Sequence, residues 1–350
     1  MKTYTLNEAL KTKKSKNLNF IKFLAALAVI ISHAYPISQG KEFGDVLISF
    51  SKGHLGIGGV AVGVFFFSSG LLVSKSIEKS ENLKQFLKKR CLKIFPPLIF
   101  TVILTVFLLG PIFTNMTISD YFTDLATYKY LLNAILIPIH SLPGVFENNI
   151  YGNVINGALW TLPIEFICYI ALMFCYKLGL LRKKILFTFP ISLIFFYLLY
   201  YSNIPIFSSI SIYTLPIFIY YMGMLYYVFR DKIILNKLLA VFLIIVWSGF
   251  VYFGFAEIAM FLIFPYIFSV IVFNKKQCSE KLSELGNLSY GIYLCGFPIQ
   301  QIVVCLFGGK MDVYFNMAIS VVLAVVLGFV IYRICEQKIP KILVSSLNRV

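Results

Sequence analysis

A lysine and a histidine stand eleven residues apart within one strongly apolar stretch of this sequence. Lys22 and His33 lie in NFIKFLAALAVIISHAYP, residues 19–36, and every residue from 23 to 31 is apolar. On an α-helix this spacing separates the two positions by about 16 Å along the axis, at ~1.5 Å per residue. A titratable group inside a membrane-spanning helix costs roughly 2.5–3.5 kcal/mol, so such groups mostly face a cavity and serve function. The stretch therefore predicts a proton-transfer histidine inside a membrane.

His33 is the first candidate for chemistry, because an imidazole accepts and releases protons near neutral pH. A histidine at the membrane interface, bonded to a neighbouring carbonyl, is the simpler alternative. The two other histidines, His54 and His140, fall in stretches that we expect to be outer loops, where surface positions are common. We therefore predict His33 as the group that handles the proton.

A second set of candidates is cationic. Arg90 and Lys93 are three residues apart, so they share a helix face. Attraction to anionic lipid explains most clusters of this kind near a membrane. It explains Lys22 less well, because Lys22 lies within the apolar run. A cationic pocket at the inner mouth of the protein would suit the phosphates of a cofactor. We expect Lys22, Arg90 and Lys93 to form it.

The third candidate is Glu165, five residues after Trp160 in ALWTLPIEFICYI. We expect it near the outer end of its helix, at about the depth of His33, where a carboxylate needs a partner. It could orient the His33 imidazole, as a carboxylate does in hydrolase triads. It could instead bind a substrate hydroxyl, or make a structural bond to an outer-loop amide. The sequence leaves these three roles open.

The composition excludes a soluble globular domain, because 59% of the residues are hydrophobic and only 13% are charged. The long apolar runs indicate an all-α polytopic membrane protein embedded in a lipid bilayer. The net charge of +16 could suggest a nucleic-acid partner, but the cations gather on one side of the predicted topology, so we expect none. No Cys/His spacing suggests a zinc site, and we expect no metal.

The apolar runs predict ten transmembrane helices, at residues 19–36, 57–74, 94–110, 159–176, 185–201, 210–229, 238–253, 256–273, 288–307 and 313–334. With ten spans, the lysines and arginines fall on the amino-terminal side except Lys41, Lys52, Lys129 and Lys310. Because basic loops stay cytoplasmic, both termini are predicted to be cytoplasmic.

Two segments that lie between the predicted spans are not expected to cross the membrane. Residues 130–140 are apolar but too few to cross a ~30 Å hydrocarbon core. We therefore expect residues 125–140 to be re-entrant or interfacial, within the outer loop between helices 3 and 4. The cation-rich residues 75–93 predict a short amphipathic helix at the membrane surface, and Pro96 and Pro97 are expected to open the third span.

The domain organisation follows from this topology. We expect a basic cytoplasmic segment at residues 1–18, one integral-membrane domain at residues 19–343 and a cytoplasmic tail at residues 344–350. The first apolar run lacks a small-residue cleavage pattern after it, so it is expected to remain as a permanent helix.

Several motifs occur in order along the chain. They are Lys22 and His33 with ten residues between them, GVFFFSSGLLVSKS at 63–76, FLKKRCLKIFPPL at 86–98, NGALWTLPIEFICYI at 156–170 and LGNLSYGIYLCGFPIQQ at 285–301. Together they resemble the acyltransferase 3 family, integral-membrane enzymes that acylate extracytoplasmic glycans. Lys22 stands where Arg is commoner in that family, Lys93 where a second Arg is usual, and Gly296 where many members carry His.

The resemblance implies acyl-CoA, with acetyl-CoA expected, as the cytoplasmic donor and a cell-surface or lipid-linked glycan as the acceptor. It places the chain in the plasma (inner) membrane of a bacterial-type cell. Lys22, Arg90 and Lys93 would hold the phosphates of the donor. The thioester would then lie near His33, which acts as general base or as transient acyl carrier, while Glu165 orients the imidazole. The sequence leaves open which glycan is acylated and whether the chain forms a homo-oligomer.

The rival function is a proton-coupled transporter or flippase of a glycan or glycan precursor, in which His33 and Glu165 relay protons. A non-catalytic sensor or scaffold is a third alternative. Transporters of this kind carry internal repeats with broken helices in matching halves, and the sequence shows no such symmetry. It therefore favours the enzyme.

Overall fold

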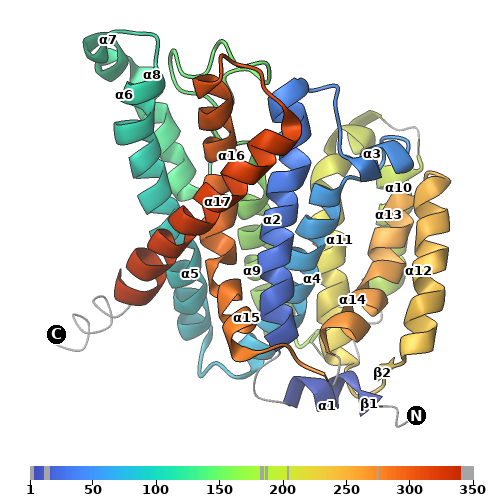
Figure 1. The fold of residues 1–350 in the computed structure, drawn as a ribbon. Coiled ribbons are helices and arrows are strands. Elements are labelled where there is room, and N and C mark those ends of the chain that lie inside the picture. Colours follow the sequence, from blue (N-terminus) through green and yellow to red (C-terminus); the bar gives the residue numbers. More distant parts are fainter. Residues whose placement is uncertain are drawn as a thin grey trace, which may run out of the picture. The chain divides into compact units, whose positions relative to one another are not determined.

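The structure is a computed structural model that describes residues 4–11, 16–181, 185, 188–202, 205–273 and 276–339. These residues are mostly helical (Figure 1). The α-helices are α1 (Leu6–Lys11), α2 (Lys16–Gln39), α3 (Val46–Phe50), α4 (Ile57–Glu78), α5 (Leu83–Leu104), α6 (Gly110–Phe113), α7 (Ile118–Thr123), α8 (Leu125–Lys129), α9 (Thr161–Lys177), α10 (Thr188–Tyr200), α11 (Pro205–Val228), α12 (Lys237–Tyr252), α13 (Ala256–Ile258), α14 (Phe264–Val272), α15 (Glu280–Glu284), α16 (Ser289–Leu306) and α17 (Val313–Ile331).

Shorter elements complete the chain. Three-ten turns occupy Tyr130–Ile135, Gly157–Trp160 and Leu285–Leu288, and π-helical turns occupy Thr105–Leu109, Ala259–Ile263 and Tyr332–Lys338. A two-residue strand β1 (Tyr4–Thr5) pairs antiparallel with β2 (Ile234–Leu235).

Six helices among the described residues are long and apolar enough to cross a membrane. They are Lys16–Gln39, Ile57–Glu78, Leu83–Phe113, Gly157–Lys177, Glu280–Leu306 and Val313–Lys338. Thr188–Tyr200, Lys237–Tyr252 and Ala256–Val272 are shorter apolar helices. The predicted helical fold is therefore confirmed, and these helices are consistent with a polytopic membrane protein. The number of ten spans, the cytoplasmic termini and the single membrane domain at 19–343 stay predictions, and the predicted tail at 344–350 lies outside the described residues.

The separate surface helix predicted at residues 75–93 is wrong. α4 continues to Glu78, and α5 starts at Leu83 and runs through Pro96 and Pro97 without a break. Each proline removes a helical N–H, which usually ends a helix, but neighbouring helices can supply the missing bonds in a membrane protein. The two prolines leave the carbonyls of Leu92 and Lys93 without their usual helical donors. The Tyr290 hydroxyl on α16 donates to the next carbonyl, that of Ile94, at 3.0 Å.

The chain divides into two compact units. Unit 1 comprises Met1–Ala25, Val46–Leu87 and Ile164–Gly286, and unit 2 comprises Ala26–Asp45, Lys88–Pro163 and Asn287–Val350. The long helices α2, α5 and α9 each contribute residues to both units.

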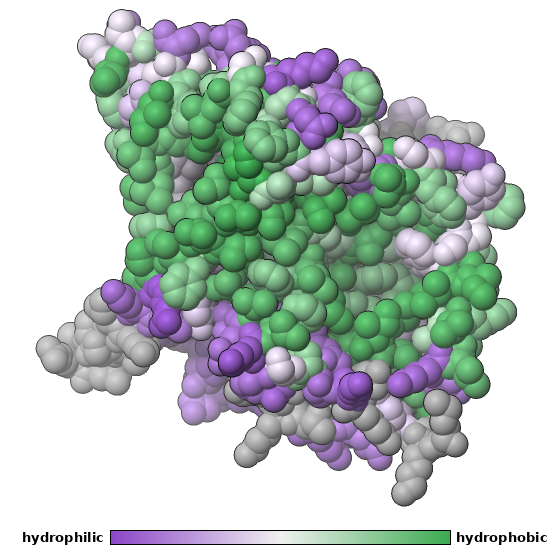
Figure 2. Space-filling model, in the orientation of Figure 1, coloured by the Kyte–Doolittle hydropathy of each residue, from purple (hydrophilic) through white to green (hydrophobic). Residues whose placement is uncertain are grey.

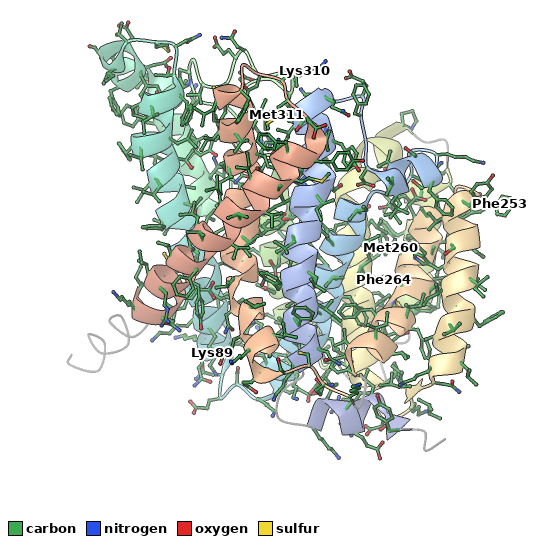
Figure 3. The ribbon with its side chains drawn as sticks, in the orientation of Figure 1. Lys89, Phe253, Met260, Phe264, Lys310 and Met311 are labelled. Carbon is green, nitrogen blue, oxygen red and sulfur yellow. The ribbon has the colours of Figure 1, made fainter. Side chains whose placement is uncertain are left out.

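Unit 1 is built around the pair α4 and α11, whose backbones touch at two glycines. A Cβ at Gly223 would lie 2.7 Å from the amide nitrogen of Leu71, and a Cβ at Gly70 would overlap the carbonyl of Tyr220. Small residues at such a crossing let two membrane helices approach closely. Met260, in the π-helical turn Ala259–Ile263, fills the space beside Gly63 of α4, and Phe264 at the start of α14 lies next to it (Figure 3).

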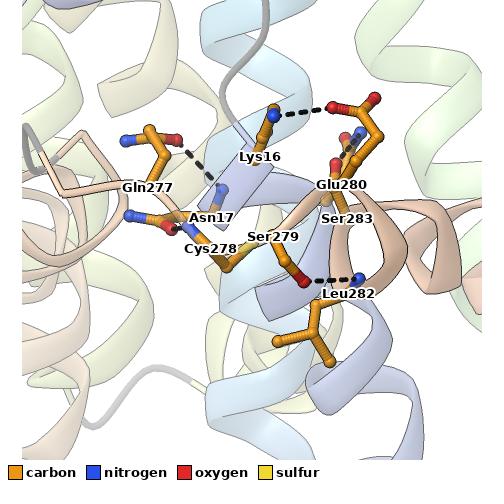
Figure 4. A network of polar contacts seen from close by, with 9 residues as sticks. Lys16, Asn17, Gln277, Cys278, Ser279, Glu280, Leu282 and Ser283 are labelled. Atoms are coloured by element: carbon orange, nitrogen blue, oxygen red, sulfur yellow. Dashed lines mark hydrogen bonds and ion pairs between the residues drawn. The ribbon is translucent and has the colours of Figure 1, made fainter.

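Hydrogen bonds and an ion pair hold the amino-terminal residues against the rest of unit 1. The Lys75 ammonium donates to the carbonyl of Leu10 at 2.6 Å, at the end of α1. The start of α2 is held in the same way (Figure 4): Lys16 pairs with Glu280 at 2.7 Å, and Asn17 accepts from the backbone amide of Cys278 at 2.8 Å. The helix that carries Lys22 therefore begins at a fixed point in unit 1.

In unit 2, α16 and α17 cross in close contact (Figure 1), since a Cβ at Gly291 would lie 2.8 Å from the carbonyl oxygen of Gly328. Asn316 of α17 donates to Ser38 of α2 at 2.8 Å, and both side chains are fully buried. Lys89 lies at one end of this unit and Lys310 at the other (Figure 3). The outward face of α17 is apolar (Figure 2) and exposes Val322, Leu323, Val326, Phe329 and Val330, as a lipid-facing helix does.

Residues 111–157 of unit 2 form short helices and loops. Tyr121 of α7 is fully buried and donates to the carbonyl of Val106 at 2.9 Å, and burial raises the pKa of its hydroxyl to about 12. Thr114 and Val145 form an isolated antiparallel bridge across the base of the tract. The tract is therefore folded onto unit 2. The re-entrant or interfacial position of residues 125–140 in the membrane stays a prediction.

Candidate active site

His33 lies in unit 2, six residues before α2 ends at Gln39, and its side chain is partly exposed. The edge of its ring meets Phe297 of α16, with 5.2 Å between ring centroids. Phe297 in turn meets Tyr151 of the tract at residues 111–157 at 5.5 Å, and the Lys41 ammonium lies 5.2 Å from the centre of the Tyr151 ring. An aromatic row thus runs from the predicted base to the surface of the unit.

The loop that carries Tyr151 is held by α16. Gln301 donates to the carbonyls of Gly152 at 3.0 Å and Val154 at 2.7 Å. It also accepts from the Asn149 amide at 3.0 Å. Three residues beyond Val154 the 3₁₀ turn begins and packs on the aromatic row, because a Cβ at Gly157 would lie 2.8 Å from the Phe297 ring. The position of the loop beside His33 is therefore fixed by buried amide hydrogen bonds.

Gly296 occupies the position where the resemblance leads one to expect a histidine. A Cβ at Gly296 would lie 2.8 Å from Cγ1 of Ile30, so α2 and α16 are in near contact at this point. A side chain as large as imidazole has no room here unless Ile30 moves. Ile30 precedes His33 by about one helical turn, so the glycine lets α16 approach the segment of α2 that carries His33.

Asp45 is a site residue that our sequence reasoning missed. Its side chain is only 1% exposed, and it accepts from the hydroxyl of Ser32 at 2.5 Å, the residue before His33. Its carboxylate lies close enough for its charge to act on the His33 imidazole. The sequence signal was weak, because Asp45 stands in a polar loop among glycines where solvated acidic residues are common. Burial, which only the structure shows, distinguishes it.

Arg90 and Lys93 lie together on the first half of α5 in unit 2, as predicted from their spacing. Lys93 is exposed and Arg90 is partly buried. The Tyr290 bond to Ile94 fixes the helix one residue after Lys93. Glu336 of the π-helical turn after α17 lies near enough to Lys93 for their charges to interact. The face is cationic and accessible, as a phosphate site requires.

Glu165 and Lys22 lie in unit 1. Lys22 is partly buried within α2. Glu165 accepts through one oxygen, Oε1, from the hydroxyl of Ser69 of α4 at 3.1 Å and from the hydroxyl of Tyr169, one turn later in α9. The two hydroxyls are themselves 3.3 Å apart. Sequence reasoning identified the carboxylate but not these partners.

The structure thus brings His33, Arg90 and Lys93 into one unit, and Lys22 and Glu165 into the other. The predicted pairing of Glu165 with His33, and the predicted phosphate site that joins Lys22 to Arg90 and Lys93, stay predictions. In the part of the chain that the structure describes, no three His, Cys, Asp or Glu side chains gather as a metal site would need.

Comparison with known proteins gives two kinds of match. A family model described as an acyltransferase domain matches residues 15–333. An O-acetyl transferase of Shigella phage Sf6 is 36% identical over 157 residues, which are 45% of this chain and 44% of that protein. Nodulation protein 10 of Rhizobium leguminosarum bv. viciae is 29% identical over 159 residues, 45% of this chain and 42% of that protein. The chain thus spans less than half the length of these relatives. No solved structure matches it.

Proposed function

The chain belongs to the acyltransferase 3 family, and we propose that it is a membrane-bound O-acyltransferase. It moves an acyl group, with acetyl expected, from cytoplasmic acyl-CoA to a hydroxyl of an extracytoplasmic or lipid-linked glycan. The similarity to an O-acetyl transferase of a Shigella phage supports the acetyl group and the oxygen acceptor.

The observation that carries the proposal is the continuity of α2. Lys22 and His33 belong to one unbroken helix of 24 residues. Eleven residues make about three turns at 3.6 residues per turn, so both positions share a helix face about 16 Å apart. That distance is comparable to an extended pantetheine arm. A phosphate held at Lys22 would therefore let the arm follow α2 and present its thioester at His33.

Arg90 and Lys93 would bind further phosphate oxygens of the donor. A guanidinium can make two parallel hydrogen bonds to one phosphate, and an exposed ammonium adds a mobile positive charge. The exposure of Lys93 and the partial exposure of Arg90 support this role. Both residues lie on a helix that Tyr290 fixes close to them.

The transfer itself needs a base. The oxygen of the acceptor hydroxyl attacks the thioester carbonyl while His33 takes the hydroxyl proton. The carbon–sulfur bond then breaks, and the imidazolium returns the proton to the departing thiolate, which leaves an ester and free CoA. In the alternative route the imidazole first takes the acyl group itself and passes it to the hydroxyl. Asp45 supports the positive charge that develops on His33. Glu165 would either orient the imidazole or bind the acceptor hydroxyl.

The membrane arrangement is part of the proposal. Ten spans with both termini cytoplasmic put Arg90 and Lys93 on the cytoplasmic side and residues 111–157 outside, with residues 125–140 re-entrant or interfacial. The plasma (inner) membrane of a bacterial-type cell is the expected location, which the bacterial and phage origin of the two relatives supports.

The test is mass spectrometry of surface polysaccharide from cells with and without this chain. We expect an O-acetyl group on one hydroxyl that is absent from the deletion and restored by the wild-type gene but not by His33→Ala. An unchanged polysaccharide in the deletion would contradict the proposal. Altered export of an unmodified glycan would favour a transporter instead.

A further inference from the structure

The carboxylate of Glu165 is held from one side only. Ser69 and Tyr169 both donate to Oε1, and both are largely buried, at 8% and 2% exposure. Ser69 lies in the middle of α4, which the close contact of Gly70 with α11 fixes in place. Tyr169 follows Glu165 by one turn on α9. Two donors from two helices therefore define where Oε1 lies and how the carboxylate plane is turned.

The second oxygen is different. Within the described residues Oε2 accepts no hydrogen bond, and it is not among the buried polar atoms that lack a partner. It is therefore reachable from outside the side-chain packing. A carboxylate with one oxygen satisfied and the other accessible is arranged to accept one more hydrogen bond, which is what a substrate hydroxyl offers.

The two roles that remain for Glu165 in catalysis are orientation of His33 and binding of the acceptor. The imidazole already has a carboxylate in its own unit, since the charge of buried Asp45 acts on it and Asp45 is bonded to the residue before it. This leaves the acceptor role for Glu165.

We propose, on the basis of the proposed function, that Oε2 of Glu165 binds the hydroxyl of the acceptor glycan and that Ser69 and Tyr169 are the residues that position it. The ligand is thus a sugar hydroxyl, and the site is specific for a hydrogen-bond donor. Glu165→Gln keeps the shape but removes the charge, so it weakens this contact. Tyr169→Phe and Ser69→Ala leave the charge but let the carboxylate turn.

The experiment measures initial rates of the purified full chain with labelled acetyl-CoA and an oligosaccharide released from the polysaccharide of the deletion strain. We expect Glu165→Gln, Tyr169→Phe and Ser69→Ala each to raise KM for the oligosaccharide roughly tenfold or more, about the effect of one lost hydrogen bond to a charged group. KM for acetyl-CoA and kcat should stay within about twofold.

Two matched controls separate positioning from packing. Ser68 is buried next to Ser69 but donates to a carbonyl of its own helix, and Tyr176 lies exposed on α9. Ser68→Ala and Tyr176→Phe should leave KM for the oligosaccharide unchanged. Ser69→Thr keeps the hydroxyl, so it should reverse most of the rise in KM for the oligosaccharide that Ser69→Ala causes. It also shows that a protein changed at this position folds.

A double variant completes the test. In Glu165→Gln, adding Tyr169→Phe should change KM for the oligosaccharide less than about twofold, because both act through the same carboxylate. Independent, multiplied effects would overturn the inference, as would a fall in kcat with KM for the oligosaccharide unchanged. In both cases the wild-type enzyme is active and the proposed function stands. A wild-type chain that transfers no acetyl group to the oligosaccharide overturns the proposed function, and this inference with it.

Discussion

Gln300 and Gln301 provide a matched pair of buried amides on α16. Both are fully buried. The Gln301 side chain makes three hydrogen bonds, to Gly152, Val154 and Asn149, which hold the loop of Tyr151. Gln300 donates once, to the carbonyl of Ile30 at 2.8 Å, and its Oε1 makes no hydrogen bond among the described residues. Replacing each by leucine keeps a similar side-chain volume but removes a different number of hydrogen bonds.

The magnitudes follow from this count. Three neutral hydrogen bonds at about 0.5–1.5 kcal/mol each give a loss of roughly 2–4 kcal/mol for Gln301→Leu. For Gln300→Leu one bond is lost, but a buried acceptor without a partner is also removed, so the net change is about 0–1 kcal/mol. At roughly 2 °C per kcal/mol for a chain of this size, Gln301→Leu should melt roughly 4 °C below Gln300→Leu.

The assay is thermal unfolding of both variants and the wild type in the same detergent, with acyl transfer measured alongside. We expect Gln301→Leu to lose transfer as well, because the loop that carries Tyr151 is released beside Phe297 and His33. Equal melting temperatures for the two leucine variants would refute the reasoning, since it would mean that the three loop bonds do not hold the fold.

Three further predictions test other parts of the account. Arg90→Ala should weaken acyl-CoA binding about ten- to hundredfold in calorimetry at low salt, with Arg90→Lys only partly tolerated; equal binding by wild type and Arg90→Ala would remove the phosphate site. Cysteines placed at the exposed positions Ser119 and Asn148 should react with an impermeant reagent from the outer face, and labelling of either from the cytoplasm alone would break the ten-span topology. Gly223→Ala should lower the melting temperature because its Cβ meets the α4 backbone, whereas Gly249→Ala, with open space around it, should not; similar behaviour of the two would contradict the packing of α4 on α11.

The long apolar helices were predictable because hydropathy over about 20 residues reports burial in a bilayer directly. The predicted spans at 288–307 and 238–253 agree within a residue or two with α16 and α12. The start of α5 was not predictable in this way, since two adjacent prolines normally mark a helix end. The continuation of α5 through both prolines is seen only in the structure, where Tyr290 of α16 packs beside it and donates to Ile94.

The candidate site was predicted unevenly for a similar reason. His33 and Glu165 stand out because a titratable residue in an apolar run is rare. Asp45, Ser69 and Tyr169 do not stand out, since an aspartate in a polar loop and hydroxyls within an apolar helix are ordinary by composition. Their contribution lies in burial and in hydrogen bonds between residues up to 100 positions apart in the chain. Such contacts are set by tertiary packing, which local sequence does not specify.

The central claim is that His33 handles the proton of the transfer. The direct measurement is the rate of acetyl transfer by purified His33→Ala. The matched control is His54→Ala, because His54 is an exposed histidine. A general acid–base group contributes about 10²–10⁴-fold. We therefore expect transfer to fall by at least about a hundredfold in His33→Ala, with acyl-CoA binding and melting temperature unchanged and with His54→Ala at the wild-type rate. Transfer by His33→Ala at a near wild-type rate would contradict the account.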